Sequence, residues 1–446
     1  MFEAFRKHSF SHGIHPPTHK ELTKGLEIKR LPFADELIIL LSQHLGAPAK
    51  AIVNAGQEVV RGEPIAEAGG FVSVPMHAPA SGIITKIDLC KNMRGEKTPA
   101  IYLKPYSGAS QDVLYGADQD IEHMESKAVI QAVQNTGVVG LGGAAFPTHV
   151  KLAVPEGTSI DTVIGNGCEC EPYLTTDHRV MVEHAKDIVH GMKVVMKAVG
   201  AKQGIIGLED NKPDAVQSLT EAAVDEPTIR VQALPTKYPQ GAEKMLTKAI
   251  LNREIPSGGL PSEVGVAVFN VATLAQIGEL LPRQQGLIER VVTITGPGVK
   301  RPGNYIMALG TPLQFILDHV GVDKEVSQII LGGPMMGPVL ATMDVPLTKG
   351  VTGILVLRTQ DIHKPGKVYP CIKCGSCIDA CPMHLNPSRL GMLARAEQYE
   401  PMSEDYHLMD CFECGCCSYV CPANIPLVQQ FRIAKGIIRE RKAKSA

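Results

Sequence analysis

Two copies of one cysteine spacing constrain this 446-residue chain more than any other feature. Eight of its 12 cysteines fall in two runs, each with three cysteines separated by two residues and a fourth that directly precedes a proline. The runs are Cys371, Cys374, Cys377 and Cys381 before Pro382, and Cys411, Cys414, Cys417 and Cys421 before Pro422. Spacings this short bring thiolates together, so the C-terminal part of the chain has to fold around two multi-cysteine sites.

This spacing is typical of proteins that bind two [4Fe–4S] clusters, in which the fourth cysteine of each run ligates the other run's cluster. We therefore assign to cluster 1 the ligands Cys371, Cys374, Cys377 and Cys421, and to cluster 2 the ligands Cys411, Cys414, Cys417 and Cys381. Two structural zinc sites are the alternative, but zinc needs only two close pairs of ligands, so a third cysteine per run would be surplus. Cys416 is expected to point away from its cluster.

The composition excludes several classes of function. With 44 basic and 46 acidic residues the net charge is −2, only 4% of residues are aromatic and tryptophan is absent, so nucleic-acid binding is not expected. No stretch approaches the ~20 apolar residues that cross a bilayer. The N-terminal residues do not form a signal-peptide pattern. We therefore expect a reducing compartment, in which the cysteines act as metal ligands or redox groups.

Two blocks precede residue 106. Residues 1–30 contain His8, His12, His15 and His19, but Pro16 and Pro17 interrupt any helical face, which favours an extended arm on the surface over a metal site. Residues 31–105 alternate Val and Ile with glycine at the turns, which predicts paired hairpins. They resemble the biotinyl/lipoyl carrier domains, which form a small barrel-sandwich. Residues 71–78, where the carrier lysine would stand, contain no lysine, so this domain is predicted to be a docking or scaffold module.

Three further blocks follow. Residues 120–283 alternate helix and strand, which predicts a Rossmann-like α/β sheet with helices on its faces. Within it, residues 180–199 carry one helical apolar stripe. Residues 285–355 look like a β-grasp of the SLBB type, and residues 362–367 read as a linker. The segments between and after the cysteine runs have helical composition, which predicts a helical two-cluster module over residues 366–440 rather than a β-rich ferredoxin.

A glycine-rich loop, residues 137–151, precedes the first long strand of the α/β block. Glycines let backbone N–H groups approach a phosphate closely, although a tight turn has the same composition. The loop resembles that of the FMN- and NADH-binding subunit of respiratory complex I, with Leu141 in place of arginine and Ala145 in place of glycine. Residues 166–173, 238–243 and 269–273 resemble three further motifs of that family. Four residues depart from these motifs: Cys168, Cys170, Ala242 and Ala272.

Over nearly its full length the chain is similar to the C subunit of the Rnf-type ferredoxin:NAD oxidoreductase complex. The resemblance rests on Gly13-Ile14-His15-Pro16-Pro17 followed by His19-Lys20, on residues 142–148 and 166–172, and on both cysteine runs. It implies a peripheral subunit on the cytoplasmic side of the bacterial inner membrane that binds FMN, NAD(H) and two [4Fe–4S] clusters. Its implied partners are the other Rnf-type subunits, including integral membrane ones that move Na⁺ or H⁺, and ferredoxin indirectly.

The resemblance also implies the roles of single residues. Nicotinamide passes two electrons as hydride and each cluster passes one, so a flavin with both modes belongs between them and no general base is required. The FMN phosphate and ribityl chain would be held by Gly140, Gly142, Gly143, Lys151 and Asn166, with Asn270 and Thr273 near them. The flavin or nicotinamide face would be lined by Glu169, Glu171, Tyr238 and Glu243, with Phe146 stacking on NADH.

Two other functions are compatible with these modules. A cobalamin reductase of bacterial microcompartments shares the flavin, α/β and two-cluster parts but works without a membrane complex. A non-enzymatic scaffold would use the same folds only to dock its neighbours. Co-purification with integral membrane partners would separate the first from the Rnf-type function, and bound flavin together with NADH oxidation would exclude the second.

Overall fold

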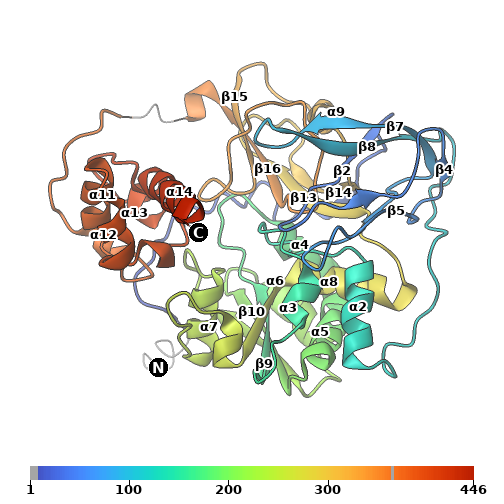
Figure 1. The fold of residues 1–446 in the computed structure, drawn as a ribbon, viewed down its shortest axis with the longest axis horizontal. Coiled ribbons are helices and arrows are strands. Elements are labelled where there is room, and N and C mark those ends of the chain that lie inside the picture. Colours follow the sequence, from blue (N-terminus) through green and yellow to red (C-terminus); the bar gives the residue numbers. More distant parts are fainter. Residues whose placement is uncertain (1–8, 363–365, 446) are drawn as a thin grey trace.

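The computed structural model describes residues 9–362 and 366–445. Figure 1 shows a unit of parallel strands and helices below a β-rich region, with a helical module to one side. His8 and part of the linker predicted over residues 362–367 lie outside the described residues. Within the described part, no helix is long and apolar enough to cross a membrane.

The first β-rich unit consists of two small antiparallel sheets. Their strand orders are β2-β8-β7-β4 and β3-β5-β6. Apolar side chains from both sheets, including Leu37, Ile65 and Ile101, are fully buried between them. The turn between β5 and β6 contacts the next unit, since the Phe71 carbonyl lies 2.7 Å from His149 Nε2. The strands are β2 (Leu37–Leu40), β3 (Lys50–Ala51), β4 (Glu58–Val59), β5 (Pro64–Glu67), β6 (Met76–His77), β7 (Gly82–Lys91) and β8 (Lys97–Pro105).

The α/β unit contains a wholly parallel four-stranded sheet with the order β11-β10-β9-β12. Its inner strands are almost continuously buried, as strands covered on both faces are. The strands are β9 (Thr162–Gly167), β10 (Gln203–Glu209), β11 (Ile229–Leu234) and β12 (Val266–Asn270). The helices are α2 (Ser126–Asn135), α3 (Thr148–Leu152), α4 (Thr176–Glu183), α5 (Ala185–Val199), α6 (Pro213–Ala222), α7 (Glu243–Leu251) and α8 (Val271–Leu280).

The prediction of a single helix over residues 180–199 is wrong. The backbone leaves the helical conformation at His184, so α4 and α5 are separate helices. The His184 ring lies 3.1 Å from the Asp187 carboxylate at the start of α5. The apolar stripe is nevertheless buried, because Met181 on α4 and Ile188 and Met192 on α5 enter the same core.

The second β-rich unit is a mixed five-stranded sheet with the order β1-β14-β13-β16-β15. Helix α9 buries Ile316, Leu317 and Val320 against it. The outer strand β1 comes from the N-terminal arm and pairs in parallel with β14. The SLBB assignment of this unit stays a prediction. Its elements are β1 (Ile28–Arg30), β13 (Glu289–Thr295), β14 (Gly303–Ala308), α9 (Leu313–Val320), β15 (Val326–Leu331) and β16 (Gly353–Arg358).

The described residues 366–445 form a helical module without strands, in agreement with the sequence. Its core contains Leu390, Met402, Phe431 and Ala434, each almost fully buried. A short helix contains the third cysteine of each run, and longer helices surround the two short ones. They are α10 (Ser376–Asp379), α11 (Pro387–Arg395), α12 (Tyr399–Glu404), α13 (Cys416–Tyr419) and α14 (Leu427–Ser445).

The N-terminal arm is extended and lies mostly on the surface, as predicted, but a few of its residues are inserted into the molecule. Ile14, Lys20 and Thr23 are buried, because the arm runs between the other units before it reaches β1. Burial is possible since polar groups of the arm find partners there. Lys20 Nζ donates to the backbone carbonyls of Glu171 and Leu174, and Thr23 Oγ1 accepts from Thr175 Oγ1 at 2.8 Å.

Candidate functional site

The chain order of the parallel sheet creates a crevice between β9 and β12. The strands proceed outward from β9 to β10 and β11, and the chain then returns to place β12 on the other side of β9. Asn166 and Asn270, near the carboxyl ends of these two neighbours, are in register. Ligands of open α/β sheets bind outside the carboxyl ends of the strands at such a reversal of strand order. Two of the predicted flavin contacts therefore stand at the position that the topology favours.

The glycine-rich loop lies across this edge. Leu141 N donates to Thr273 Oγ1 at 2.9 Å, and Gly140 N donates to the carbonyl of Phe146 at 2.8 Å, which closes the loop. Asn270 caps α8 by accepting from Ala272 N and Thr273 N. A Cβ on Gly142 would lie 3.2 Å from Asn270 Nδ2. The loop tip therefore rests on the start of α8, while Gly142 and Gly143 are exposed.

Two buried basic side chains hold the glycine-rich loop from its inner side. Arg290 donates to the Leu141 carbonyl at 3.1 Å, and Lys349 donates to the Gly137 carbonyl at 2.7 Å. Burial lowers the pKa of Arg290 to about 10 and that of Lys349 to about 7. Both come from the second β-rich unit, so the loop is fixed by two units of the chain.

On the outer side of the crevice, two more predicted residues form a pair. Lys151 Nζ lies 3.0 Å from Glu243 Oε2 and donates to the Val268 carbonyl at 3.3 Å. Both side chains are at least a third exposed. Asn166 Nδ2 donates to the carbonyl of Gly241 at 2.8 Å. The structure therefore brings together Gly142, Gly143, Lys151, Asn166, Glu243, Asn270 and Thr273.

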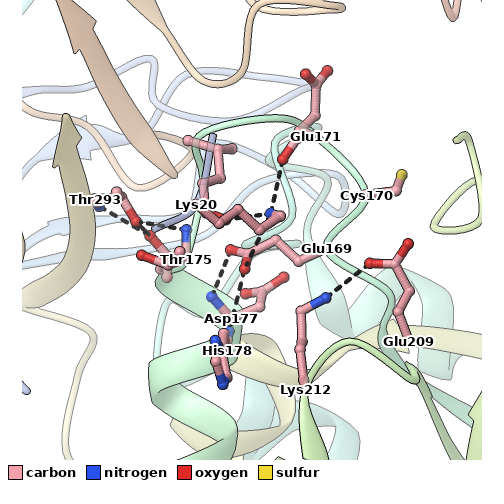
Figure 2. Close-up of polar contacts among 12 residues, drawn as sticks. Lys20, Glu169, Cys170, Glu171, Thr175, Asp177, His178, Glu209, Lys212 and Thr293 are labelled. Carbon is pink, nitrogen blue, oxygen red and sulfur yellow. Dashed lines mark hydrogen bonds and ion pairs between the residues drawn. The ribbon is translucent and has the colours of Figure 1, made fainter. Parts of the chain in front are cut away.

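The loop between β9 and α4, residues 168–175, contains two glutamates and is called the acidic loop below. Its first carboxylate, that of Glu169, points inward toward the start of α4 (Figure 2). Glu169 accepts from the backbone N–H groups of Asp177 and His178 at the start of α4, where the helix dipole favours an anion. Lys20 of the arm lies 3.9 Å from Glu169. Glu169 is therefore a buried structural carboxylate beneath the crevice, and the flavin-facing position expected for it is not seen.

Two other carboxylates of this region each have one oxygen without a partner among the described residues. These are Glu171 Oε1 and Asp177 Oδ1. Their other oxygens accept from Met335 N at 3.0 Å and from Asn270 Nδ2 at 2.7 Å. Burial raises the pKa of both carboxyl groups to about 7. The unpartnered Asp177 Oδ1, next to Asn270 at the crevice, fits a ligand that supplies hydrogen-bond donors.

Sequence reasoning misses several residues of this site. No motif selects Asp177, Arg290 or Lys349, and Lys20 stands in a motif that gives it no role. Only Asp177 carries a local signal, as an acid in the first turn of a helix after two threonines. The other three act across more than a hundred residues of sequence, which no local pattern reports.

Tyr238 faces the helical module rather than the crevice. It is almost fully buried, and its hydroxyl donates to the backbone carbonyl of Cys414 at 2.6 Å. It packs there with Ile14, Ala380 and Cys416. The expected place of Tyr238 at the flavin or nicotinamide face is therefore replaced by a contact between two units. Phe146 remains in the turn of the glycine-rich loop.

The helical module contains two cavities lined by cysteines. The first is lined by Cys371, Cys374, Cys377 and Cys421, among other residues. The second is lined by Cys381, Cys411, Cys414 and Cys417. The fourth cysteine of each run thus lines the cavity of the other run. Cys416 also lines the second cavity, but it is fully buried and packs with Ile14 and Tyr238, so its orientation away from the cluster stays a prediction.

The donor sets suit the cofactors that the sequence implies. Each cavity contains, within an apolar lining, the four cysteines predicted as cluster ligands, which match the four thiolates of a [4Fe–4S] cluster. The crevice offers a glycine-rich loop without side chains at its tip, a lysine, two asparagines and the unpartnered Oδ1 of Asp177. These groups can contact a phosphate through backbone N–H groups and a sugar chain through amides.

Comparison with known families matches three parts of the chain. Residues 8–107 match the RnfC barrel sandwich hybrid domain, residues 133–279 match the Nuo51 FMN-binding domain, and residues 370–425 match the 4Fe-4S dicluster domain. The barrel-sandwich, FMN-binding and two-cluster parts of the predicted architecture are thereby confirmed. The dicluster match also favours iron–sulfur clusters over structural zinc.

The fold has relatives among solved structures. Two structures of NAD⁺-reducing [NiFe]-hydrogenase, air-oxidised and H₂-reduced, align with TM-scores of 0.52 and 0.50 at 18% and 19% identity. The alignments cover 71% and 70% of this chain, and 64% and 63% of the hydrogenase chains, so this chain spans somewhat less than two thirds of those relatives. At these identities the likeness shows a shared fold.

Three curated proteins match along almost the whole chain. The C subunits of the ferredoxin:NAD(+) oxidoreductase complexes of Clostridium ljungdahlii, named proton-translocating, and Acetobacterium woodii, named Na(+)-translocating, are 41% and 42% identical over 96% of this chain. The matches cover 93% and 96% of those proteins. The C subunit of an ion-translocating oxidoreductase complex of Rhodobacter capsulatus is 38% identical over all of this chain and 86% of its own length. On these matches, the chain belongs to the family of Rnf complex C subunits.

Proposed function

We propose that this chain is the NAD(H)-oxidising and NAD⁺-reducing subunit of a membrane-bound ferredoxin:NAD oxidoreductase that moves Na⁺ or H⁺. One observation carries the proposal: the crevice of the FMN-binding domain and the second cysteine cavity belong to units that are joined by a direct contact between Tyr238 and Cys414. A two-electron site and a one-electron site are thus held in adjoining units of one chain. The full-length relatives favour this function over a microcompartment cobalamin reductase.

The proposed chemistry assigns simple tasks to the residues of the crevice. When bound, FMN supplies the exchange between hydride and single electrons, and nicotinamide supplies the hydride. Gly142 and Gly143 offer backbone N–H groups to its phosphate, and Lys151 offers a cation, while the Gly140 N–H is used to close the loop. Asn166 and Asn270 offer amides to its sugar chain. Arg290 and Lys349 beneath the loop keep these donors in place. No ionisable side chain is then needed at the reacting atoms.

The surroundings of the two cavities support an order of electron transfer. Cys414 and Cys417 are buried, and Cys414 packs against Tyr238 of the α/β unit, which we call the flavin unit from here on. Cys374 is exposed. Cluster 2 would therefore exchange electrons with the flavin, and cluster 1 would exchange them with the outside.

The exposed side of cluster 1 is a suitable contact for the next electron carrier. Val368, Tyr369 and Ile372 are each more than half exposed beside Cys371 and Cys374. Large apolar side chains on a surface mark sites of protein contact. We place the other Rnf-type subunits there, integral membrane ones included, on the cytoplasmic side of the membrane, with ferredoxin reached indirectly.

An anaerobic preparation of the full chain tests the function. We expect about eight iron atoms and eight sulfides per chain, as two cubanes require, together with one non-covalent FMN. NADH should reduce the flavin first and the clusters afterwards. Two zinc ions without sulfide, or a preparation that holds FMN but is not reduced by NADH, would contradict the proposal.

A further inference from the structure

The N-terminal arm contacts the helical module within its first described residues. Gly13 N donates to the Ala380 carbonyl at 3.3 Å, and the His12 ring lies 3.2 Å from the Ile378 carbonyl. Ser11 Oγ lies 2.9 Å from His384 Nε2. Ala380 and His384 flank Cys381, which lines the cavity of cluster 2. The arm therefore contacts the module on the side of that cluster.

The same few residues of the arm are paired with the flavin unit. Ile14 and Tyr238 exchange both backbone hydrogen bonds at 2.9 Å, as in an antiparallel ladder. One position earlier in the flavin unit, Lys237 Nζ donates to the Phe10 carbonyl at 2.8 Å and lies 4.4 Å from the centre of its ring. Residues 10–14 thus bridge the two units through backbone groups of the arm.

An apolar cluster closes the junction around these bonds. It contains Ile14 of the arm, Tyr238 of the flavin unit, and Ala380, Cys414 and Cys416 of the module, all of them at most 9% exposed. The hydroxyl of Tyr238 crosses the junction to the carbonyl of Cys414. Because this carbonyl belongs to a predicted ligand of cluster 2, the junction sets where that ligand lies relative to the flavin unit.

The arm is anchored firmly on its other side. The Thr18 carbonyl accepts from Tyr173 N at 2.8 Å, and the buried Lys20 binds carbonyls of the acidic loop. Strand β1 then joins the sheet of the second β-rich unit. Because the arm is fixed to these units after residue 14 and to the module before it, the arm resists separation of the module from the flavin unit.

We infer that residues 10–14 form a strap, and that Tyr238 is a positioning residue, which together hold cluster 2 at a fixed distance from the flavin. This rests on the proposed function. It gives the Gly13-Ile14-His15-Pro16-Pro17 motif a task in electron transfer, although the strap lies at the junction and not in the crevice. The strap does not bind NADH or FMN, so opening it should slow transfer from flavin to cluster 2 and leave reduction of the flavin unchanged.

Gly13→Val opens the strap with little change elsewhere. Gly13 has φ +81°, which valine adopts only with strain, and a Cβ there would lie 2.6 Å from the carbonyl oxygen of Tyr238. Gly25→Val is the matched control, because Gly25 lies in the same arm, is exposed and has no atom within 4 Å of such a Cβ. Tyr238→Phe removes only the hydroxyl that crosses the junction.

Hydrogen–deuterium exchange measures opening of the strap directly in the anaerobic full-length holoprotein. The amides of Ile14 and Tyr238 exchange only when their pairing opens. Gly13→Val should accelerate both by at least about tenfold, Tyr238→Phe by up to about tenfold for one buried bond, and Gly25→Val should change neither. Unchanged exchange in Gly13→Val would overturn the strap.

Stopped-flow absorbance then reads the consequence. With iron, sulfide and FMN contents equal to those of the unaltered chain, Gly13→Val should keep the NADH-driven flavin phase and slow the cluster phase. Faster exchange with an unchanged cluster phase would overturn the positioning role. A failure of the proposed function gives a different result, because the unaltered chain itself would then show no NADH-driven phase. The hydrogen-exchange results do not depend on NADH, so they would still test the strap.

Discussion

The two cysteine cavities share one sequence motif and differ in their surroundings. The cavity of cluster 2 is lined by the buried Cys381, Cys414 and Cys417 and lies against the arm and the flavin unit. The cavity of cluster 1 includes the exposed Cys374 and is bordered by the exposed Ile372. Identical ligand spacing therefore specifies a cluster but not its place in a chain of carriers. That place is decided by what the rest of the polypeptide packs against each cavity.

The largest expected effect comes from Cys417→Ala compared with Cys374→Ala. Each change removes one ligand, so each should abolish about half of the cluster signal in electron paramagnetic resonance after reduction by dithionite. Only Cys417→Ala removes the proposed entry site, so NADH should then fail to reduce the remaining cluster. In Cys374→Ala, NADH should still reduce cluster 2. Reduction of the remaining cluster by NADH in Cys417→Ala would reverse the order that we propose.

A change in the glycine-rich loop should affect both cavities equally, because it acts before either of them. Gly142→Val places a branched side chain beside Asn270, because even its Cβ would lie 3.2 Å from the Asn270 amide nitrogen. The side chain also fills the proposed place of the phosphate. We expect FMN affinity to fall roughly a hundredfold. Flavin fluorescence after gel filtration measures the loss.

In this variant NADH should reduce neither cluster, while dithionite should still reduce both. The exposed Gly25→Val again serves as the control with an intact flavin site. Full retention of FMN in Gly142→Val would mean that the loop is only a tight turn.

The charge of Glu171 should affect the reduction potential of cluster 2 and not that of cluster 1. Its carboxylate accepts from Met335 N, and the Met335 carbonyl lies 3.2 Å from where a Cβ on Gly415 would stand, between two cysteines of the cluster 2 cavity. Burial raises its pKa to about 7, so it becomes ionised as pH rises through neutrality. A new negative charge disfavours the added electron of a nearby cluster.

The midpoint potential of cluster 2 should therefore fall by some tens of mV between about pH 6 and pH 8, while that of cluster 1 stays level. Potentiometric titration followed by electron paramagnetic resonance measures both, and Glu171→Gln should remove the slope. An equal slope for both clusters would exclude Glu171 as its source.

The raised pKa of Glu171 also makes the free energy of unfolding depend on pH. Since the folded-state pKa of Glu171 lies above its usual value of 4.5, the folded chain holds the proton more tightly. This contribution to the free energy of unfolding is complete below about pH 4.5 and is lost as pH rises through about 7. Glu171→Gln should flatten that part of the pH profile of denaturant unfolding.

How much of this molecule can be predicted from sequence follows from the range of the interactions. The cysteine runs, the glycine-rich loop and the helices α11 and α14 are set by neighbours in sequence, and the structure places them where the pattern indicates. A local motif predicts Tyr238 at the flavin face, yet it packs on Cys414, 176 positions away. The polar composition of the arm predicts a surface position, yet Lys20 is buried among carbonyls of residues 171–174. Contacts between units leave no periodicity in either partner.

The smallest effect is expected at the second contact between the module and the flavin unit. Asp410, next to Cys411, accepts from Ser257 Oγ at 2.5 Å and from Gly258 N at 3.2 Å, and lies 3.7 Å from Lys244 Nζ. Asp410→Ala removes these bonds but leaves the strap and Tyr238 in place. Because the bonds lie at the edge of the junction, we expect a loss of about 1 kcal/mol of docking free energy.

Exchange of the Gly258 amide should accordingly become several-fold faster in Asp410→Ala, and transfer from flavin to cluster 2 should slow less than in Gly13→Val. Asp405→Ala, an exposed aspartate of the same module, is the control. If the strap and Asp410 hold one rigid junction, the double variant Gly13→Val/Asp410→Ala should lose more than the sum of the single changes, because either contact alone still limits separation. A merely additive loss would mean that the two contacts fix different parts of the module, and only the strap would then determine the position of cluster 2.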